Sequence, residues 1–326
     1  MQGDLGAWLE TGTGDDAEFV ERAWRLLVRR APEPAARDSA LTKLRRGELS
    51  RASLLRELAT SDEIDRVALL DDGLSFAAAA RARPRTVRGP ARPRELHAPA
   101  WSDERSIEIP WCLARYDGEQ RVLDVGYAFA EAAYVAGLVA LGARELVGVD
   151  LASADAPGLT PVVADVRGLP FADGHFELIV CISTIEHVDR DLAVYDVDAP
   201  RDDRGDEAAL RELHRVLGRD GRLLVSVPTG EPEDQGWQVQ HTPEEWIDRF
   251  ETAGFLVFED ELYVRGDGGW ATATPAETRG VRLAPDRSGG GAVLLAELRP
   301  ARLAETLRLA ARDARHHGTR RRSTLA

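Results

Sequence analysis

Short apolar segments alternate with helical patterns over most of the chain, between residues 107 and 298. These segments lack the polar alternation of strands that face water, so we expect each to be buried on both faces of one sheet. Strands separated by helices are joined in parallel, with the helices covering both faces. The pattern predicts an α/β domain with a mainly parallel seven-stranded sheet. The predicted strands are residues 121–125, 145–150, 161–165, 176–182, 222–227, 255–264 and 292–298.

A second, purely helical pattern precedes this sheet. Apolar residues recur at three- and four-residue spacing from Phe19 to Leu27, and Ser50 is placed to cap a later helix. The 326 residues suffice for two domains at roughly 150 residues each. We expect a flexible N-terminus at 1–14, a small all-α accessory domain at 15–70, an Arg/Pro-rich linker at 71–105, the α/β domain at 106–298 and a basic helical tail at 299–326.

Composition excludes several classes of function. The formal net charge of -14 opposes general binding to nucleic acid, because an acidic surface repels phosphate backbones. No apolar run approaches the roughly 20 residues of a membrane-spanning helix, and the first residues lack the pattern of a secretory signal. Two cysteines, Cys112 and Cys181, exclude a disulfide framework and fit a reducing compartment. We expect a cytoplasmic protein without a membrane span.

Acidic residues stand at the ends of the first three predicted strands, where open parallel sheets bind ligands. Asp124 is followed by the loop Val125-Gly126-Tyr127-Ala128, whose small residues let the backbone approach a ligand closely. Asp150 can accept hydrogen bonds from both hydroxyls of a ribose. Asp165 can take an exocyclic amine, with Val166 flanking an adenine. The alternative is that Asp124 satisfies backbone amides in a turn and that Asp165 caps one.

This set of motifs resembles the class I S-adenosylmethionine-dependent methyltransferases, in particular the methyltransferase-type-11-like subgroup. The resemblance runs from about Ile107 to Leu298 and is most specific at Asp165–Phe171, at Phe176–Val180 and at Ser183–Val188. The chain departs from the family in its first motif, where Gly126, Ala128 and Ala130 replace three glycines.

The resemblance implies a Rossmann-like fold and S-adenosyl-L-methionine as the cofactor. It also implies a binding role for particular residues: a loop around the methionine part, ribose and adenine contacts, and a serine beneath the sulfonium. The implied residues are, in that order, Asp124, Gly126, Tyr127 and Ala128; Asp150 and Leu151; Asp165 and Val166; and Ser183.

A neutral hydroxyl acceptor would need a base to take its proton, and histidine is the usual choice. His187 follows the fourth strand and His241 precedes the helix cap Thr242, so these two are the candidates. Either could instead be a packing or surface histidine. The acidic stretch from Asp189 to Asp206 is expected to be a solvated loop over the acceptor rather than a magnesium site, so we expect no metal.

The N-terminal pattern resembles a bacterial helical domain of unknown function related to phycobilisome-linker repeats. Such domains accompany enzymes of surface glycans, which implies a docking partner. We therefore expect methyl transfer to a hydroxyl on a small-molecule or glycan acceptor, most simply a sugar. The alternatives are an amine or hydroxyl of a small natural product, or a non-catalytic scaffold that keeps the fold. A nicotinamide-dependent oxidoreductase would need Gly-x-Gly-x-x-Gly, which the first loop lacks.

Overall fold

The computed structural model describes residues 15–28, 32, 34–82, 96–192, 204–284 and 290–301. The chain divides into two compact units: unit one is Met1–Asp72 with Glu131–Ala133, and unit two is Gly73–Ala130 with Tyr134–Ala326. None of the helices in the described part is both long and apolar enough to cross a membrane. The predicted flexible N-terminus lies outside the described residues.

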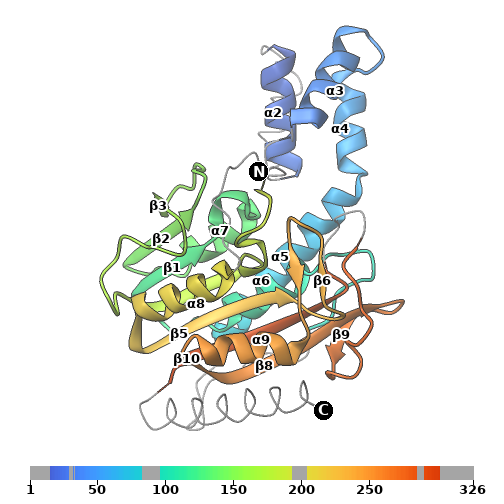
Figure 1. Cartoon of the computed structure of the whole chain (residues 1–326). Coiled ribbons are helices and arrows are strands. Elements are labelled where there is room, and N and C mark those ends of the chain that lie inside the picture. Colours follow the sequence, from blue (N-terminus) through green and yellow to red (C-terminus); the bar gives the residue numbers. More distant parts are fainter. Residues whose placement is uncertain are drawn as a thin grey trace. The chain divides into compact units, whose positions relative to one another are not determined.

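Unit one is built from short helices that have their own apolar core (Figure 1). They are α2 (Asp16–Leu27), α3 (Pro34–Arg45), α4 (Arg51–Ala59) and the first half of α5 (Asp62–Arg81). Asp15 accepts the amide of Glu18 at 2.8 Å, and Ser50 accepts that of Ser53 at 3.1 Å, so both helices begin with a side-chain cap. The predicted apolar face of α2 is buried in the core.

Unit two contains the predicted Rossmann-like sheet, with eight strands among the described residues instead of seven. Their order is β3-β2-β1-β4-β5-β10-β8-β9; β3 to β5 are parallel, and the last three are antiparallel. The strands are β1 (Arg121–Val125), β2 (Glu145–Asp150), β3 (Thr160–Val163), β4 (Phe176–Ile182), β5 (Leu217–Pro228), β8 (Phe255–Gly266), β9 (Gly269–Ala273) and β10 (Ala292–Pro300). The unpredicted strand, β9, is short and forms a hairpin with β8. A separate two-stranded ribbon pairs β6 (Glu233–Asp234) with β7 (Val239–Gln240).

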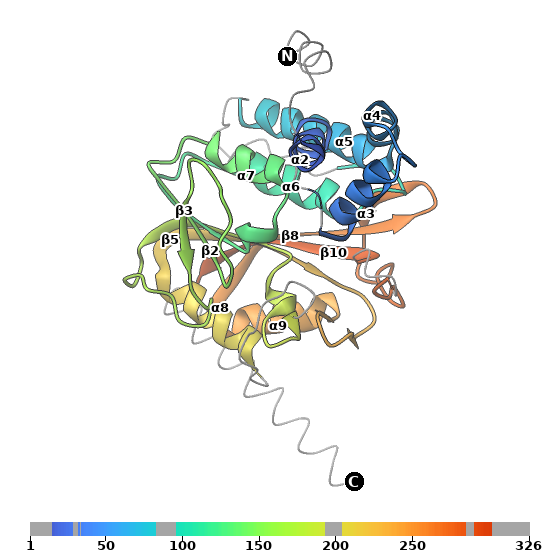
Figure 2. The same cartoon turned by 90° about the horizontal axis from the view of Figure 1, so that it is seen from above.

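Helices cover both faces of this sheet (Figures 1 and 2). One face carries α6 (Arg105–Ala114) and α7 (Ala132–Val139), and the other carries α8 (Gly205–Val216) and α9 (Pro243–Thr252). Helix α9 begins with a capping box in which Thr242 and Glu245 each accept the other's backbone amide. Helix α6 is buried almost throughout, so it is part of the core.

Two predicted boundaries differ from the structure. Residues 71–81, expected in the linker, continue helix α5, whose Arg81 donates to the carbonyl of Leu113 in α6 at 2.8 Å. This stretch is helical because alanines follow Phe76 without a break, which favours helix over linker. Residues 299 and 300, expected in the tail, belong to β10. Residues 83–95 of the linker and 302–326 of the tail lie outside the described part.

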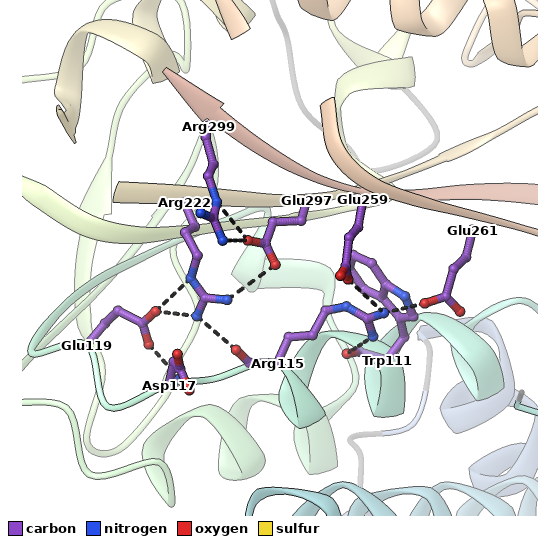
Figure 3. Close-up of polar contacts among 9 residues, drawn as sticks. All are labelled: Trp111, Arg115, Asp117, Glu119, Arg222, Glu259, Glu261, Glu297 and Arg299. Atoms are coloured by element: carbon purple, nitrogen blue, oxygen red, sulfur yellow. Dashed lines mark hydrogen bonds and ion pairs between the residues drawn. The ribbon is translucent and has the colours of Figure 1, made fainter. Parts of the chain in front are cut away.

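Buried charges join the end of α6 to the sheet (Figure 3). Arg222 in β5 donates to Glu119, to the carbonyl of Arg115 at 2.8 Å and to Glu297 at 3.3 Å. Arg115 in turn pairs with Glu261 of β8. The side chains of Arg115 and Glu297 are fully buried. These pairs hold α6 against β5, β10 and β8, and α6 supplies part of the site described next.

Candidate functional site

The loop after β1 is held at the carboxyl edge of the sheet by both neighbouring strands. Gly126 has a φ of 95°, and its amide donates to Val149 of β2 at 2.9 Å. On the β4 side, Thr184 donates to the carbonyl of Val125 at 3.0 Å. A Cβ on Gly126 would collide with the Thr184 hydroxyl, so this position requires glycine for both conformation and space.

Asp150, the last residue of β2, faces this loop. Its two carboxylate oxygens accept the amides of Ala128 at 3.1 Å and Ala152 at 3.2 Å. Partial burial raises the pKa of Asp150 above its ordinary value. Leu151, the predicted adenine contact, follows directly and is partly buried.

Asp124 is buried beneath the loop, with 1% of its surface exposed. One carboxylate oxygen accepts from the Tyr134 hydroxyl, while the other has no hydrogen-bond partner within the described residues. Burial raises the pKa of Asp124 to about 7. Tyr134, which the sequence argument missed, comes from α7 and shows no motif that would have revealed it.

Tyr127, also predicted to bind the cofactor, lies inside the domain and is 2% exposed. Its ring lies against the backbone of Gly148 in β2, and its hydroxyl accepts the amide of Ala154 at 3.3 Å. The side chain therefore anchors the segment after β2, and the loop backbone on either side of it remains at the edge.

Asp165 is engaged by an arginine two residues later. Arg167 donates to both of its oxygens, at 2.6 to 3.1 Å, and also to Asp189 at 2.5 Å. Although partial burial opposes the effect, the hydrogen bonds from Arg167 lower the pKa of Asp165 below its ordinary value. Val166 packs against the core of the domain. Arg167 and Asp189 were not predicted, and their partnership joins loops that are 22 positions apart in sequence.

Ser183 connects the end of β4 to helix α6. It adopts a φ of 41°, unusual for a residue with a side chain, and its amide donates to Ser226. Its hydroxyl donates to Glu108 at 2.7 Å, and Arg105 donates to the other oxygen of Glu108 at 2.5 Å. Glu108 was missed, although a lone carboxylate inside the apolar run 107–113 was a usable signal.

Glu186 lies in the 3-10 helix η2 (Ile185–His187) and is 2% exposed. Burial raises the pKa of Glu186 to about 8, and burial likewise raises the pKa of Glu104, at the start of α6, to about 7. Each has one buried oxygen without a hydrogen-bond partner in the part of the chain that is described. Neither residue was predicted from the sequence, even though Glu186 directly precedes the candidate base His187.

The two candidate bases have different surroundings. Nδ1 of His187 donates to the carbonyl of Trp237 at 2.9 Å, and the two rings stack at 5.1 Å, so the proton sits on Nδ1 and Nε2 keeps its lone pair. Burial lowers the pKa of His187 to about 4. The ring of His241 packs edge-on against Trp246. Burial is the largest cause that lowers the pKa of His241, and the charge of Arg249 lowers it further.

The assembled edge thus combines a loop that turns at Gly126, carboxylates at the ends of β1 and β2, and a buried polar cluster after β4.

Residues 62–263, more than half of the chain, match the model of a methyltransferase domain family (Methyltransf_23). The chain belongs to this family. It is an S-adenosylmethionine-dependent methyltransferase, with S-adenosyl-L-methionine as the methyl donor. The match begins in α5, ahead of the expected start of the domain at residue 106.

Solved structures offer more distant likenesses. A 1,6-didemethyltoxoflavin-N1-methyltransferase from Burkholderia thailandensis is 16% identical, over 73% of this chain and 90% of that chain, with a TM-score of 0.40. An S-adenosylmethionine-dependent methyltransferase from Mesorhizobium loti is 14% identical over 61% and 100%, with a TM-score of 0.41. A TehB-like methyltransferase from Corynebacterium glutamicum is 19% identical over 59% and 86%, with a TM-score of 0.37. No curated protein matches the chain.

The residues present fit the methyl donor. The unpartnered oxygen of Asp124 can accept from the ammonium group of its methionine part, because a buried carboxylate is stabilised by a cation. Gly126 fixes the loop backbone at this edge, because its positive φ and its close approach to Thr184 admit no side chain. When bound, S-adenosylmethionine supplies a methyl carbon attached to a positively charged sulfur.

Proposed function

We propose that this chain methylates a small-molecule acceptor at the carboxyl edge of β1, β2 and β4. In this proposal Asp124, Gly126 and Ala128 surround the methionine part, and Asp150 accepts from the ribose hydroxyls. The supporting observation is that Asp150 already points its carboxylate at the loop amide of Ala128. On binding, the ribose hydroxyls would replace or share these backbone hydrogen bonds.

The adenine contacts follow from the same arrangement. Leu151 and Val166 would flank the ring, and Asp165 would accept from the exocyclic amine. Arg167 supports this role because it holds the Asp165 carboxylate in one orientation and keeps it ionised. Ser183 would lie beneath the sulfonium, where its hydroxyl is directed to Glu108.

The acceptor was expected from the sequence to be a hydroxyl, on a sugar or glycan precursor, with His187 or His241 as the base. The hydrogen bond from Nδ1 of His187 to the carbonyl of Trp237 supports that chemistry, since it leaves the basic lone pair of the ring on Nε2. Its low pKa opposes it, because a base with a pKa of about 4 takes a proton from a neutral hydroxyl inefficiently. This observation favours the second candidate, the amine of a small natural product.

Two further parts of the proposal concern the compartment and unit one. We place the reaction in the cytoplasm, since Cys112 and Cys181 are both free and buried. We assign unit one a docking role toward a partner. The apolar core within unit one supports this role, because it holds the helices together and so fixes the surface that they present.

Calorimetric titration with S-adenosylhomocysteine tests the proposed cofactor site. We expect Asp150→Ala to weaken binding roughly 10- to 100-fold, because it removes charge-assisted hydrogen bonds of about 1.5–3 kcal/mol. Asp267→Ala, at the exposed turn between β8 and β9, is the matched control and should bind as the unaltered protein does.

Each contrary result has a defined meaning. Absence of S-adenosylhomocysteine binding, or equal binding by Asp150→Ala, would favour the non-catalytic scaffold. Preferential binding of a nicotinamide dinucleotide would favour an oxidoreductase.

A further inference from the structure

Three carboxylates and one guanidinium gather where the start of α6 meets η2. The carboxylates belong to Glu104, Glu108 and Glu186, and the guanidinium to Arg105. They lie close enough that Glu108 and Glu104 raise the pKa of Glu186, while Arg105 lowers it. With all four ionised, the cluster carries an excess of two negative charges.

Hydrogen bonds in the cluster are unevenly distributed. Glu108 is satisfied at both oxygens, by Arg105 at 2.5 Å and by the Ser183 hydroxyl at 2.7 Å. The exposed fraction of Glu186 is 2%, and one of its carboxylate oxygens has no hydrogen-bond partner among the described residues. Glu104 keeps another. The one guanidinium among these four side chains, that of Arg105, therefore donates to Glu108, which also receives a hydrogen bond from Ser183.

Such an arrangement is costly unless a proton or a bound cation neutralises the carboxylates. Burying an uncompensated carboxylate costs roughly several kcal/mol, and buried polar groups are nearly always paired in native proteins. A metal ion is one conceivable partner. Within the described part of the chain, however, no three His, Cys, Asp or Glu side chains are placed to hold one. An organic cation binds carboxylates through hydrogen bonds and does not require three ligands around one point, so it fits this cluster better.

The cluster is tied directly to the cofactor loop. Thr184, two residues before Glu186, donates to Val125 and closes against Gly126. Ser183 links the same turn to Glu108. The unpaired Glu186 carboxylate is therefore fixed relative to the loop that, in the proposed function, surrounds the methyl donor.

We propose that the methyl acceptor is a nitrogen base that enters as an organic ammonium ion and is held by Glu104 and Glu186. The inference rests on the proposed function, because it places the acceptor beside the same loop. Burial and, to a smaller extent, the charge of Arg105 lower the pKa of His187, so this ring stays neutral beside the cluster.

The reaction balances without any further reactant. The ammonium gives one proton to the Glu186 carboxylate, which frees the lone pair on nitrogen. That pair forms a bond to the methyl carbon, and the carbon–sulfur bond breaks with its electrons left on sulfur. The products are the methylated ammonium, S-adenosylhomocysteine and a protonated Glu186, which returns its proton to solvent.

The test compares amines with their hydroxyl counterparts on the full chain saturated with S-adenosylhomocysteine. The probes are ethanolamine with ethylene glycol, putrescine with 1,4-butanediol and phenethylamine with 2-phenylethanol, each titrated calorimetrically at pH 6.5 and 8.5. We expect at least one amine to bind tenfold or more tightly than its alcohol. Its affinity should rise with pH, as Glu104 and Glu186 lose their protons. Turnover with S-adenosylmethionine should methylate the nitrogen of that amine.

Glu186→Gln separates the proposed contact from a merely structural effect. We expect it to weaken amine binding at pH 8.5 at least tenfold while leaving S-adenosylhomocysteine affinity within about twofold. Glu57→Gln, on an exposed surface of α4, is the control and should change neither.

The possible outcomes are distinguishable. If S-adenosylhomocysteine does not bind, the proposed function fails. If it binds but no amine binds more tightly than its alcohol, or if Glu186→Gln binds amines unchanged, the amine inference fails and the function stands.

Discussion

At the scale of single residues, the site is marked by carboxylates that differ in how well they are compensated. Asp165 receives several hydrogen bonds from Arg167, and its pKa is lowered. Asp124 and Glu186 are buried with an unpartnered oxygen each, and burial raises the pKa of both, to about 7 and about 8. Perturbed carboxylates of the second kind concentrate at functional sites, where burial and neighbouring charges tune them for binding or proton transfer.

The raised pKa of Glu186 makes stability depend on pH. The carboxyl is protonated in the folded protein up to about pH 8, but only up to about pH 4.5 when unfolded. Its contribution to stability is therefore complete below about pH 4.5 and is lost as pH rises through about 8. The charged side chains that act on Glu186 are Glu104, Glu108 and Arg105. They are identical in the unaltered protein and in the variant compared with it below.

Glu186→Gln removes this titration, so we expect the variant to gain stability relative to the unaltered protein as pH rises. The gain in unfolding free energy should reach roughly 1–3 kcal/mol by pH 9, since each pKa unit corresponds to about 1.4 kcal/mol. Denaturant unfolding at pH 5, 7 and 9 measures it, with Glu57→Gln as the control. A difference that stays constant across this range would contradict the burial of Glu186 as an acid.

At the scale of elements, helix α6 does two things at once. Its first turn supplies Glu104, Arg105 and Glu108 to the acidic cluster. Its far end is attached to the sheet through Arg115 and, by way of the Arg115 carbonyl, through Arg222 of β5 (Figure 3). The buried ion pairs at one end thus hold the helix that positions the cluster at the other.

We expect Arg222→Met to destabilise the protein by about 3–5 kcal/mol, because it leaves the buried carboxylates of Glu119 and Glu297 short of a partner. Denaturant unfolding at pH 7 measures the loss. Arg204→Met is the matched control, because the Arg204 side chain is 70% exposed in its pair with Glu207. That change should leave the free energy of unfolding nearly unchanged, because water screens an exposed ion pair. Similar losses in the two variants would show that the network in Figure 3 adds little to stability.

At the scale of the whole molecule, the chain is two units that each bury their own apolar residues. The core of unit one comes from α2, α3, α4 and the turn before α4. The main core of unit two surrounds β1, β4, β5 and helices α8 and α9. All the predicted cofactor-binding residues belong to unit two.

Leu54→Ala tests whether unit one is stabilised by its own core. Leu54 is 3% exposed, and its truncation should cost unit one about 2–5 kcal/mol. Since no cofactor residue lies in that core, S-adenosylhomocysteine affinity should stay within about twofold. Hydrogen exchange of the helix amides and calorimetric titration measure the two effects. A large loss of cofactor affinity would show that the units are energetically coupled.

Much of the fold was predictable because it depends on local signals. Apolar runs such as 176–182 mark buried strands, and Asp15, Ser50 and Thr242 mark helix starts, wherever they occur. Strand β9 was missed, because Gly269–Ala273 has no such run and forms only by pairing with β8. The linker was predicted to begin at residue 71, although helix α5 continues through residues 71–81. The arginines and prolines beyond residue 81 masked this helix.

The strands and the acidic residues at their ends were readable in the amino acids themselves, and parallel strands bring their carboxyl ends to one edge. These patterns established the fold class and the family resemblance. The order of the strands in the sheet and the hydrogen bond from Ala128 to Asp150 came only with the tertiary structure. Which groups surround the acceptor was decided only in three dimensions. Glu108 and Ser183 are 75 positions apart, and their contact depends on how α6 packs against β4. Burial raises the pKa of Glu186 and lowers that of His187. This burial likewise results from the packing and has no signature in the local sequence.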